Sequence, residues 1–492
     1  MTEHLPALQV VVPLIAAPLT VLLRRPLAAW ALSVAVCAFS LYTAIRLALQ
    51  VLAQGPLSYD MGGWAPPWGI EYRIDMANAA VLVLVSLIGT VVAVYARRSV
   101  NAEIGHDRRH LFYTAYLLCF TGLLGMAATG DAFNLFVFLE ISSLSTYALI
   151  SIGYDRRALT ASYQYLIMGT VGATFLLIGI GFLYVMTGTL NMQDLAQRLP
   201  AVMDTRTVKV AFAFIVVGLS LKLALFPLHL WLPNAYAFAP SSVSAFVAAT
   251  STKVAIYVLL RFLLTIFGFQ FSFEHMPIGN ILLVLSVAAM LSASVVAIFQ
   301  QNVKRLLAYS SVAQVGYITL GISLGTSAGV AAGYLHLLNH ALIKGALFLA
   351  VGCLFYRINS ARLSDLRGAG RSMPWTAAAF VIGGLSLIGM PLTSGFISKW
   401  KLVEAALAIG WWPIAVLILA TSLLAVIYVW RVVETLYFQS AEEGTAAVSE
   451  APLGLLIPAW GLALANIYFG VDATVTWGLA HGAARALMGG VP

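Results

Sequence analysis

The sequence predicts an all-α protein that crosses a lipid bilayer many times. Of its 492 residues, 61% are hydrophobic and only 9% are charged, whereas about a quarter of the residues of a soluble protein are charged. Apolar runs of about 20 residues, long enough to cross the hydrocarbon core as a helix, recur along the whole chain. We therefore expect residues 1–492 to form a single membrane domain surrounded by lipid.

The apolar runs define the expected helices in order. We predict fourteen transmembrane helices, at 7–23, 27–52, 78–97, 111–129, 132–153, 161–186, 208–227, 241–268, 278–299, 304–325, 329–355, 373–398, 411–437 and 452–470. The longest polar segments between them, 53–77, 187–207 and 438–451, leave no room for a separate soluble domain. The first of these is rich in Gly and Pro and is expected to form a short hairpin.

The positive charges predict the orientation of the bundle. With alternate loops on opposite sides, one face receives fifteen Lys and Arg and the other face eight. The richer face contains Arg24, Arg25, Arg97, Arg98, Arg108, Arg109, Arg156, Arg157, Lys304, Arg305, Arg357, Arg362, Arg367, Arg371 and Arg431. Because positively charged loops stay inside, we expect this face to be cytoplasmic and both termini to lie outside a bacterial cytoplasmic membrane.

Two apolar segments contain residues that interrupt helices. Pro227 and Pro233 lie within LKLALFPLHLWLP, and Pro391 lies between Gly389 and Gly395 in LIGMPLTSGFISKW. Proline removes a backbone donor, and irregular backbone at bilayer depth is tolerated only where protein or water satisfies it. We therefore predict that helices 7 and 12 are broken.

Matched breaks in two parts of a chain are typical of transporters built from inverted repeats. Residues 111–268, which contain helices 4–8, and residues 278–437, which contain helices 9–13, are the expected repeats. Five helices per unit would place successive copies upside down. Proline kinks that serve packing alone are the alternative explanation.

Several ionisable side chains are predicted to lie at bilayer depth. Glu140 is in the middle of helix 5, Lys222 is near the break in helix 7, Lys253 is in helix 8, Lys344 is in helix 11, and Lys399 follows the break in helix 12. Each lysine costs about 2.5–3.5 kcal/mol there, so four cost on the order of 10–14 kcal/mol. This cost indicates a function in transport.

Glu140 and Lys222 form the first expected pair, because an isolated carboxylate at this depth would be protonated. At about 4 Å the attraction of such a pair is close to the desolvation penalty of one ion, so a small movement could transfer a proton. The alternative is a fixed ion pair that locks helices 5 and 7.

Three further groups form a stripe on helix 11. His336, His340 and Lys344 follow one another at intervals of four residues in GYLHLLNHALIKGALF, which places them on one helix face. Histidine both accepts and donates protons near neutral pH. We expect these groups to form a proton relay with Lys253 and Lys399. The alternatives are buried structural histidines, or a metal site for which the local sequence offers no third ligand. His229 is either a relay group or a loop contact.

Other functional classes have no support in the sequence. Cys37, Cys119 and Cys353 are isolated within apolar runs and predict neither disulfides nor metal ligation. The net charge of +8 is not organised into a basic stripe with aromatic residues, so nucleic acid is not an expected partner. No nucleotide-binding, haem or iron–sulfur motif is present. We expect no cofactor and no metal.

The motifs resemble those of the antiporter-like membrane subunits shared by respiratory complex I, membrane hydrogenases and Mrp-type cation/proton antiporters. The similarity covers nearly the whole chain. It is carried by GDAFNLFVFLEISSLSTY, KLALFPLHLWLPNAY, TKVAIYVLLR, KRLLAYSSVAQVGY, HLLNHALIKGALF and PLTSGFISKW. The resemblance implies that Glu140 is the essential glutamate of helix 5 and that Lys222, Lys253 and Lys399 are the family's lysines.

Within this family the chain is most similar to the Mrp D protein of the Na⁺/H⁺ antiporters. This similarity rests on the segments GGWAPPWGIEYRIDMANA and VMTGTLNMQDLA, on the length and on the absence of a C-terminal extension. The spacing of His336 and His340 departs from it, because Mrp D places its histidines next to each other and this chain has Asn339 there.

The resemblance implies a proton-translocating subunit of a multisubunit Na⁺/H⁺ antiporter, with other membrane subunits and the lipid bilayer as partners and with protons and Na⁺ as transported ions. Glu140 and Lys222 would admit the proton, Lys253, His336, His340 and Lys344 would relay it, and Lys399 would release it. The alternative is a proton-pumping subunit of a redox-driven complex, in which case the chain is part of a translocase enzyme. A non-conducting structural subunit is a second alternative.

Overall fold

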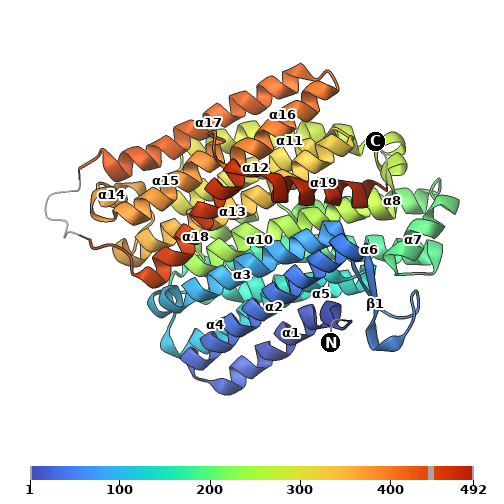
Figure 1. The fold of residues 1–492 in the computed structure, drawn as a ribbon, viewed down its shortest axis with the longest axis horizontal. Coiled ribbons are helices and arrows are strands. Elements are labelled where there is room, and N and C mark those ends of the chain that lie inside the picture. The colour runs from blue at the N-terminus through green and yellow to red at the C-terminus, as the bar shows by residue number, and fades with distance from the viewer. Residues whose placement is uncertain (1–2, 441–447, 490–492) are drawn as a thin grey trace.

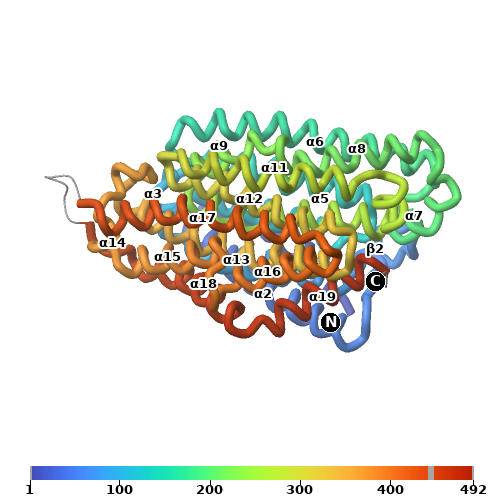
Figure 2. The backbone as a smooth tube through the Cα atoms, turned by 90° about the horizontal axis from the view of Figure 1, so that it is seen from above, coloured from blue at the N-terminus to red at the C-terminus, as the bar shows by residue number. Residues whose placement is uncertain are grey.

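The computed structural model describes residues 3–440 and 448–489, and these residues form a bundle of long, side-by-side helices (Figures 1 and 2). Within these two ranges, twelve helices are long and apolar enough to cross a membrane. They are α1 (Leu5–Leu23), α2 (Pro26–Gln54), α3 (Met76–Glu103), α4 (Arg109–Ala128), α5 (Ala132–Ser151), α6 (Arg157–Thr187), α10 (Ser241–Leu260), α11 (Ile278–Ile298), α12 (Val303–Ser323), α13 (Ser327–Ile358), α17 (Trp412–Tyr437) and α18 (Leu453–Val471). The all-α membrane fold predicted from the composition is therefore confirmed.

Two further segments consist of pairs of shorter helices. The pairs are α8 (Arg206–Lys222) with α9 (Trp231–Phe238), and α15 (Pro374–Ile388) with α16 (Ser394–Ala408). The predicted interruptions at Pro227 and Pro391 are thus present. Pro233 does not interrupt a helix as predicted, because it lies in the first turn of α9, where the missing backbone donor has no intrahelical acceptor.

The structure also contains elements that the apolar pattern did not predict. α7 (Met192–Arg198) is a short helix in the polar segment before α8, and α19 (Thr474–Met488) follows α18. The expected last helix, 452–470, covers α18 alone. Gly470 at the end of α18 lies against the backbone of Thr393, and Gly482 of α19 lies against Met76. α19 therefore runs from the neighbourhood of the α15–α16 break to the start of α3.

The predicted hairpin is present. Strand β1 (Leu57–Asp60) pairs antiparallel with β2 (Glu71–Ile74), with Leu57 opposite Ile74. Both termini lie toward the same end of the bundle as this hairpin (Figure 1). We call this end the hairpin end, and we call the opposite end, which carries Arg97, Arg156 and Arg362, the basic end.

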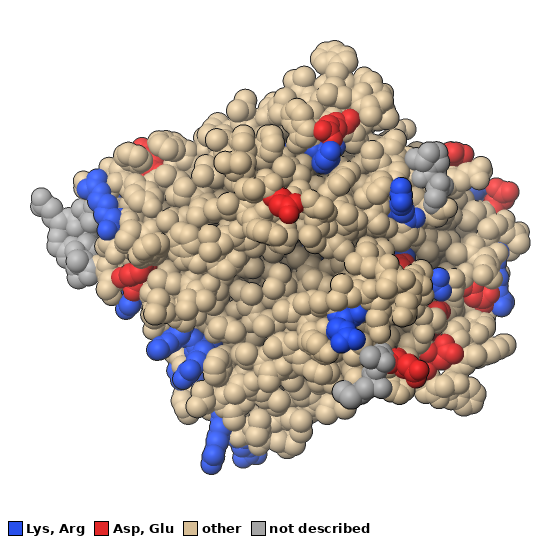
Figure 3. Space-filling view, in the orientation of Figure 1, with Lys and Arg blue, Asp and Glu red and all other residues tan. Residues whose placement is uncertain are grey.

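α13 forms the centre of the bundle. Every residue from Gly329 to Leu354 is buried, and α10, α12, α15, α16, α18 and α19 all pack on it. The outer surface is different: most of the face in Figure 3 has no charged side chain, as lipid contact requires. Polar side chains of α13 therefore face protein and not lipid.

Candidate proton-handling site

Glu140 and Lys222 lie near each other, but they are not joined directly. Among the described side chains no ion pair connects them. Lys222 instead donates to the hydroxyl of Ser143, which lies one turn after Glu140 on α5. Glu140 is half-buried, and none of the residues that the structure describes bonds its Oε1. The direct pair expected from the sequence is thus absent, and the ammonium of Lys222 is held by the Ser143 hydroxyl, which itself donates to the carbonyl of Leu139.

Aromatic rings surround the ammonium group of Lys222. Its Nζ lies 5.3 Å from the centre of the Tyr165 ring and 5.9 Å from that of Tyr147. Tyr165 is stacked on Trp231, with ring centres 3.8 Å apart, and the indole of Trp231 donates to the carbonyl of Leu221 at 3.0 Å. α9 therefore folds back to hold the end of α8, and it fixes the position of Lys222.

Lys253 lies fully buried in the middle of α10. Its Nζ donates to the carbonyl of Ala248 at 2.5 Å and approaches the hydroxyl of Thr252 at 3.3 Å. Tyr236 lies near Thr252 and Tyr165, and its hydroxyl donates to the carbonyl of Val247 at 3.4 Å. Lys253 also interacts electrostatically with His340 and Lys344 of α13.

The stripe predicted on α13 is present. The rings of His336 and His340 are parallel, with centres 6.1 Å apart. His336 is held on both sides: its Nε2 lies 2.8 Å from Gln314 Oε1, and its Nδ1 lies 2.9 Å from the hydroxyl of Ser398. Within the described part of the chain, neither nitrogen of His340 has a hydrogen-bond partner.

Lys344 ends the stripe toward the basic end. It is fully buried, and its ammonium donates to the carbonyl of Leu307 at 2.8 Å and to the hydroxyl of Ser310. Both acceptors belong to α12. The stripe is therefore connected to α12 at two levels, through Gln314 and through Ser310.

Lys399 occupies the α15–α16 break. Although it belongs to α16, its Nζ donates to the last carbonyls of α15, those of Leu387 at 3.1 Å and Ile388 at 2.9 Å, and to the hydroxyl of Ser422 at 3.0 Å. The same Nζ lies 4.7 Å from the centre of the Tyr317 ring. Tyr317 in turn lies 5.6 Å from the ring of His336. The groups His340, His336, Tyr317 and Lys399 therefore follow one another in a row.

His229 lies in the α8–α9 connection and contacts rings of two elements. Its ring is stacked on Phe226 at 5.3 Å and meets Tyr309 edge-on at 6.3 Å. Its Nδ1 has no partner. The geometry leaves both expectations for this residue open.

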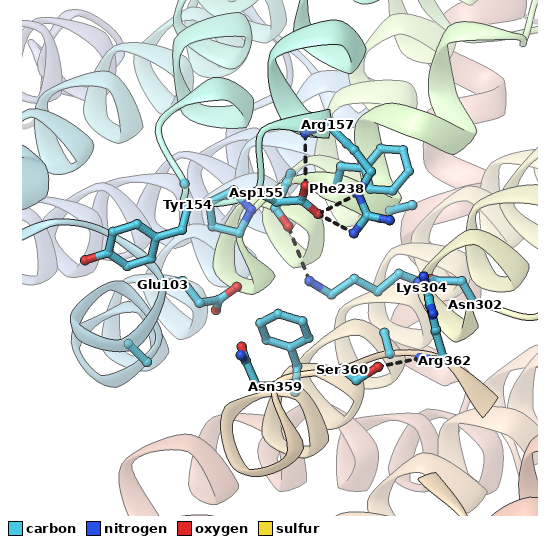
Figure 4. A pocket seen from close by; sticks show the side chains of 17 residues that line it. Glu103, Tyr154, Asp155, Arg157, Phe238, Asn302, Lys304, Asn359, Ser360 and Arg362 are labelled. Carbon is cyan, nitrogen blue, oxygen red and sulfur yellow. Dashed lines mark hydrogen bonds and ion pairs between the residues drawn. The ribbon is translucent and has the colours of Figure 1, made fainter. Parts of the chain in front are cut away.

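Lys304 does not lie on the charged surface where the sequence places it, because it is only 2% exposed. It lies in a cavity of about 310 Å³ at the basic end, where its Nζ approaches the carbonyl of Ala239 at 3.3 Å and the Phe355 ring at 4.5 Å (Figure 4). Glu103 and Asp155 line the same cavity. The sequence places Lys304 at the end of an apolar run and therefore near a loop. This position does not show that the side chain is buried.

A second cluster, at the hairpin end, was also missed by the sequence pattern. Asp75 and Arg261 form an ion pair although they are distant in the sequence, and both are buried. The predicted helix over 241–268 includes Arg261, but the sequence pattern does not show that this side chain is buried or which group it contacts. One sequence signal was available: Lys253, Tyr257 and Arg261 are spaced by four residues each, as His336, His340 and Lys344 are.

Comparison with known proteins identifies the family. Residues 129–425 match the family model described as NADH:quinone oxidoreductase/Mrp antiporter, TM. The chain belongs to this family. The matched residues include all seven of the candidate relay residues, from Glu140 to Lys399.

The relatives include members of different complexes. The chain is 42% identical to the N subunit of the NADH-quinone oxidoreductase of Desulforudis audaxviator, over 96% of each chain. It is 30% identical to the D subunit of the Na(+)/H(+) antiporter of Bacillus subtilis, over 94% of this chain and 93% of that one. A chain in the structure of the Mrp complex from Dietzia superposes with a TM-score of 0.89 at 27% identity, over 99% of this chain and 97% of that chain. The expected similarity to the complex I antiporter-like superfamily is confirmed.

Proposed function

We propose that this chain is the proton-translocating subunit of a multisubunit monovalent cation (Na⁺)/H⁺ antiporter. The observation that carries the proposal is the row of buried ionisable and aromatic groups His340, His336, Tyr317 and Lys399, which follow one another at 6.1, 5.6 and 4.7 Å. A structural core does not need a connected row of ionisable groups, and each such group is costly at bilayer depth. Proton transfer does need one.

The proposed steps follow the order of these groups. Glu140 and Lys222 exchange a proton through the Ser143 hydroxyl, and Tyr165 and Tyr236 separate that pair from Lys253. Charging Lys253 then disfavours charge on His340 and Lys344, because like charges in a medium of low dielectric constant repel strongly. The proton moves on through His336 to Lys399, whose charge acts on the neighbouring subunit. No covalent chemistry is involved.

The architecture expected from the sequence belongs to the same proposal. We infer that α8 with α9 and α15 with α16 each cross the membrane once, which together with the twelve long helices gives fourteen crossings. Residues 111–268 and 278–437 would be the inverted repeats, since each contains one of the two breaks. The basic end faces the cytoplasm, and both termini lie on the other side of a bacterial cytoplasmic membrane.

The cavity around Lys304 provides water with access from the basic end. It is lined by Glu103, Asp155 and Asn302 and reaches Pro240, the residue before α10. We infer that this cavity admits cytoplasmic water as far as the start of α10.

A redox-driven complex is the second candidate. It is favoured by one observation, the 42% identity to a subunit named for NADH-quinone oxidoreductase. In such a complex the same polar groups would move protons, but electron transfer in other subunits would drive this proton movement. Partner membrane subunits are required in both cases, and Na⁺ exchange is specific to the first.

The test uses the complete complex in everted membrane vesicles. Glu140→Gln and Lys222→Ala are expected to abolish Na⁺-dependent proton flux while the complex still assembles. Glu404→Gln is the matched control, because Glu404 is an exposed carboxylate on α16 that pairs with Lys401 at 2.7 Å. Wild-type flux in the Glu140 and Lys222 variants would overturn the proposal. Proton flux that requires NADH and not Na⁺ would favour the redox-driven complex.

A further inference from the structure

Six of the fifteen cations on the richer face lie at one corner of the bundle. The basic ends of α1, α2, α3 and α4, which pack on one another, form this corner. The six residues are Arg24, Arg25, Arg97, Arg98, Arg108 and Arg109. Arg97 of α3 and Arg109 of α4 act electrostatically on the same side chain, Tyr113. Basic side chains project at the lower left of Figure 3, where α1 turns into α2 in Figure 1. We call these six residues the arginine corner.

Several of these guanidinium groups have no partner within the described part of the chain. Those of Arg24, Arg25 and Arg98 are exposed and form neither an ion pair nor a hydrogen bond there. Arg108 approaches Asp107 at 3.9 Å, but both side chains are exposed, so water screens this pair. The arginine corner therefore carries positive charge that the protein does not compensate.

Several cations elsewhere at the basic end are held by the protein. Arg157 pairs with Asp155 at 2.7 Å, and Arg357 donates to the carbonyl of Glu450 at 2.6 Å. Lys304 is buried in its own cavity. Orientation of the chain during insertion accounts for all of these cations in the same way. It does not explain why cations without protein partners gather at one corner.

A hollow of about 470 Å³ lies at this corner between α1 and the start of α4. The residues that line it are Val21, Arg24, His106, Asp107 and His110. The hydroxyls of Thr20 and Thr114 lie 2.7 Å apart and join the two helices next to it. Asp107 is the one acid among the five lining residues, against one arginine and two histidines. The composition of the lining therefore favours an anion.

Exposed apolar side chains adjoin the same cations. Leu22, which is 76% exposed, and Leu27, which is 59% exposed, flank Arg24 and Arg25 along the chain. One turn after Leu27 lies Trp30, a residue type that is enriched where a membrane meets water. A charged rim beside an exposed apolar surface matches a phospholipid, in which a headgroup adjoins acyl chains. A free phosphate would use the cations alone.

We propose that the arginine corner is a binding site for an anionic phospholipid. The headgroup phosphate lies in the hollow, where the guanidinium groups of Arg24 and Arg25 donate to its oxygens. The acyl chains lie along Leu22 and Leu27. Clusters of basic residues at a membrane surface attract anionic lipids, and each Lys or Arg adds to the attraction. The lipid fastens the α1–α2 turn to α4, and this inference does not depend on the proposed function.

The test measures lipid binding to the purified full chain in detergent by native mass spectrometry. The probes are phosphatidylglycerol and phosphatidylcholine with the same acyl chains, because only the first has a net charge. In the double variant Arg24→Gln with Arg25→Gln we expect phosphatidylglycerol to bind roughly tenfold more weakly. Binding of phosphatidylcholine and the unfolding temperature in detergent alone should not change, because neither guanidinium group bonds the protein.

The matched control is Arg156→Gln with Arg362→Gln. It removes two exposed positive charges from the same end of the bundle but outside the arginine corner, so it should bind phosphatidylglycerol like the wild type. Equal weakening in the two double variants would overturn the proposal, because the attraction would then belong to the whole basic end. Wild-type binding in the Arg24 and Arg25 variant would overturn it as well.

Asp107→Asn gives a change in the opposite direction. It removes the acid from the hollow at an exposed position, so we expect phosphatidylglycerol to bind several-fold more tightly. Unchanged or weaker binding in this variant would contradict the assignment. Inorganic phosphate separates a lipid site from a small-anion site. If it raises the unfolding temperature of the wild type as much as phosphatidylglycerol does, the hollow binds small anions and the lipid proposal fails.

Discussion

Lys399 caps a helix to which it does not belong: its Nζ donates at 2.9 Å to the carbonyl of Ile388, the last residue of α15. The last carbonyls of a helix have no intrahelical partner and carry a partial negative charge, so an ammonium group is stabilised there. The break between α15 and α16 is thus held together by a side chain that the proposed mechanism requires to lose and regain a proton. Charge on Lys399 and the geometry of the break are linked.

Replacement of Lys399 tests this link. Lys399→Met removes the charge and leaves two carbonyls and Ser422 without their donor, so we expect a loss of about 1–3 kcal/mol in stability and loss of proton flux. Lys399→Arg keeps a positive charge but does not release a proton at neutral pH, and we expect it to retain stability and still lack flux. Thermal unfolding in detergent and vesicle flux measure the two effects. Full flux in the arginine variant would contradict a proton-releasing role.

Ser143 is expected to connect Glu140 with Lys222. Ser143→Ala removes the hydroxyl that accepts from Lys222, and we predict a several-fold fall in flux because the proton must then cross a gap without a bridging group. Ser145→Ala is the control, since the Ser145 hydroxyl bonds the carbonyl of Ile141 on its own helix. Stopped-flow measurements of proton uptake compare the two. Equal rates would argue against the bridge.

Gln314 holds His336 from α12. In Gln314→Leu the Nε2 of His336 loses its partner in a fully buried site, which costs about 1–3 kcal/mol. We also expect slower proton transfer, because the ring is no longer fixed toward Tyr317. Gln300→Leu, at a half-buried position two residues after the end of α11, is the control and should change neither property. Unfolding temperature and flux are both measured on the assembled complex.

The pH dependence of stability tests the Asp75–Arg261 pair. Burial opposes ionisation of Asp75, but the Arg261 charge and the bonds from Arg261, Asn78 and Ala77 outweigh it and hold the pKa of this carboxyl below its ordinary value. Its contribution to stability is therefore fully present above pH of about 4 and is lost as the pH falls through the lower folded-state pKa. Asp75→Asn should lack this loss. Unfolding temperatures from pH 7 to 3 should converge for the two proteins, and parallel curves would contradict the assignment.

Two glycines of α18 test the packing at the α15–α16 break. A Cβ at Gly470 would overlap the backbone of Thr393, whereas a Cβ at Gly461 meets no atom within 4 Å. We expect Gly470→Ala to destabilise the protein by about 1–3 kcal/mol through overpacking, and Gly461→Ala to change stability by less than about 1 kcal/mol. Thermal unfolding of both variants decides the point. A stable Gly470→Ala protein would show that the break has room to shift.

Helix positions, breaks and the stripe on α13 were predictable because each depends on a local pattern, either hydrophobic length or a four-residue spacing. Contacts between helices were not predictable in the same way. The bond from Lys222 to the Ser143 hydroxyl and the pairing of Arg261 with Asp75 depend on how helices distant in the sequence approach each other. Lys304 is buried by the residues of other helices around the cavity at the basic end. Its position at the end of a predicted helix does not reveal this burial.

α19 was missed for a related reason. Its residues 474–488 mix small and polar groups, and the segment contains His481 and Arg485, so it lacks the continuous apolar run on which the prediction relied. It is helical because it packs on α13 and α3, which supply the apolar surroundings that its own sequence does not. Tertiary packing therefore determines this helix more than local sequence does.

The complete enclosure of α13 also constrains how the protein is made. Four of the helices that cover it, α15, α16, α18 and α19, are synthesised later. During biogenesis a segment with two histidines, an asparagine and a lysine must therefore leave the translocon before its partners exist. Until the ribosome has completed the C-terminal helices, this segment needs shelter from lipid, by α10 and α12 on one side and by the insertion machinery on the other.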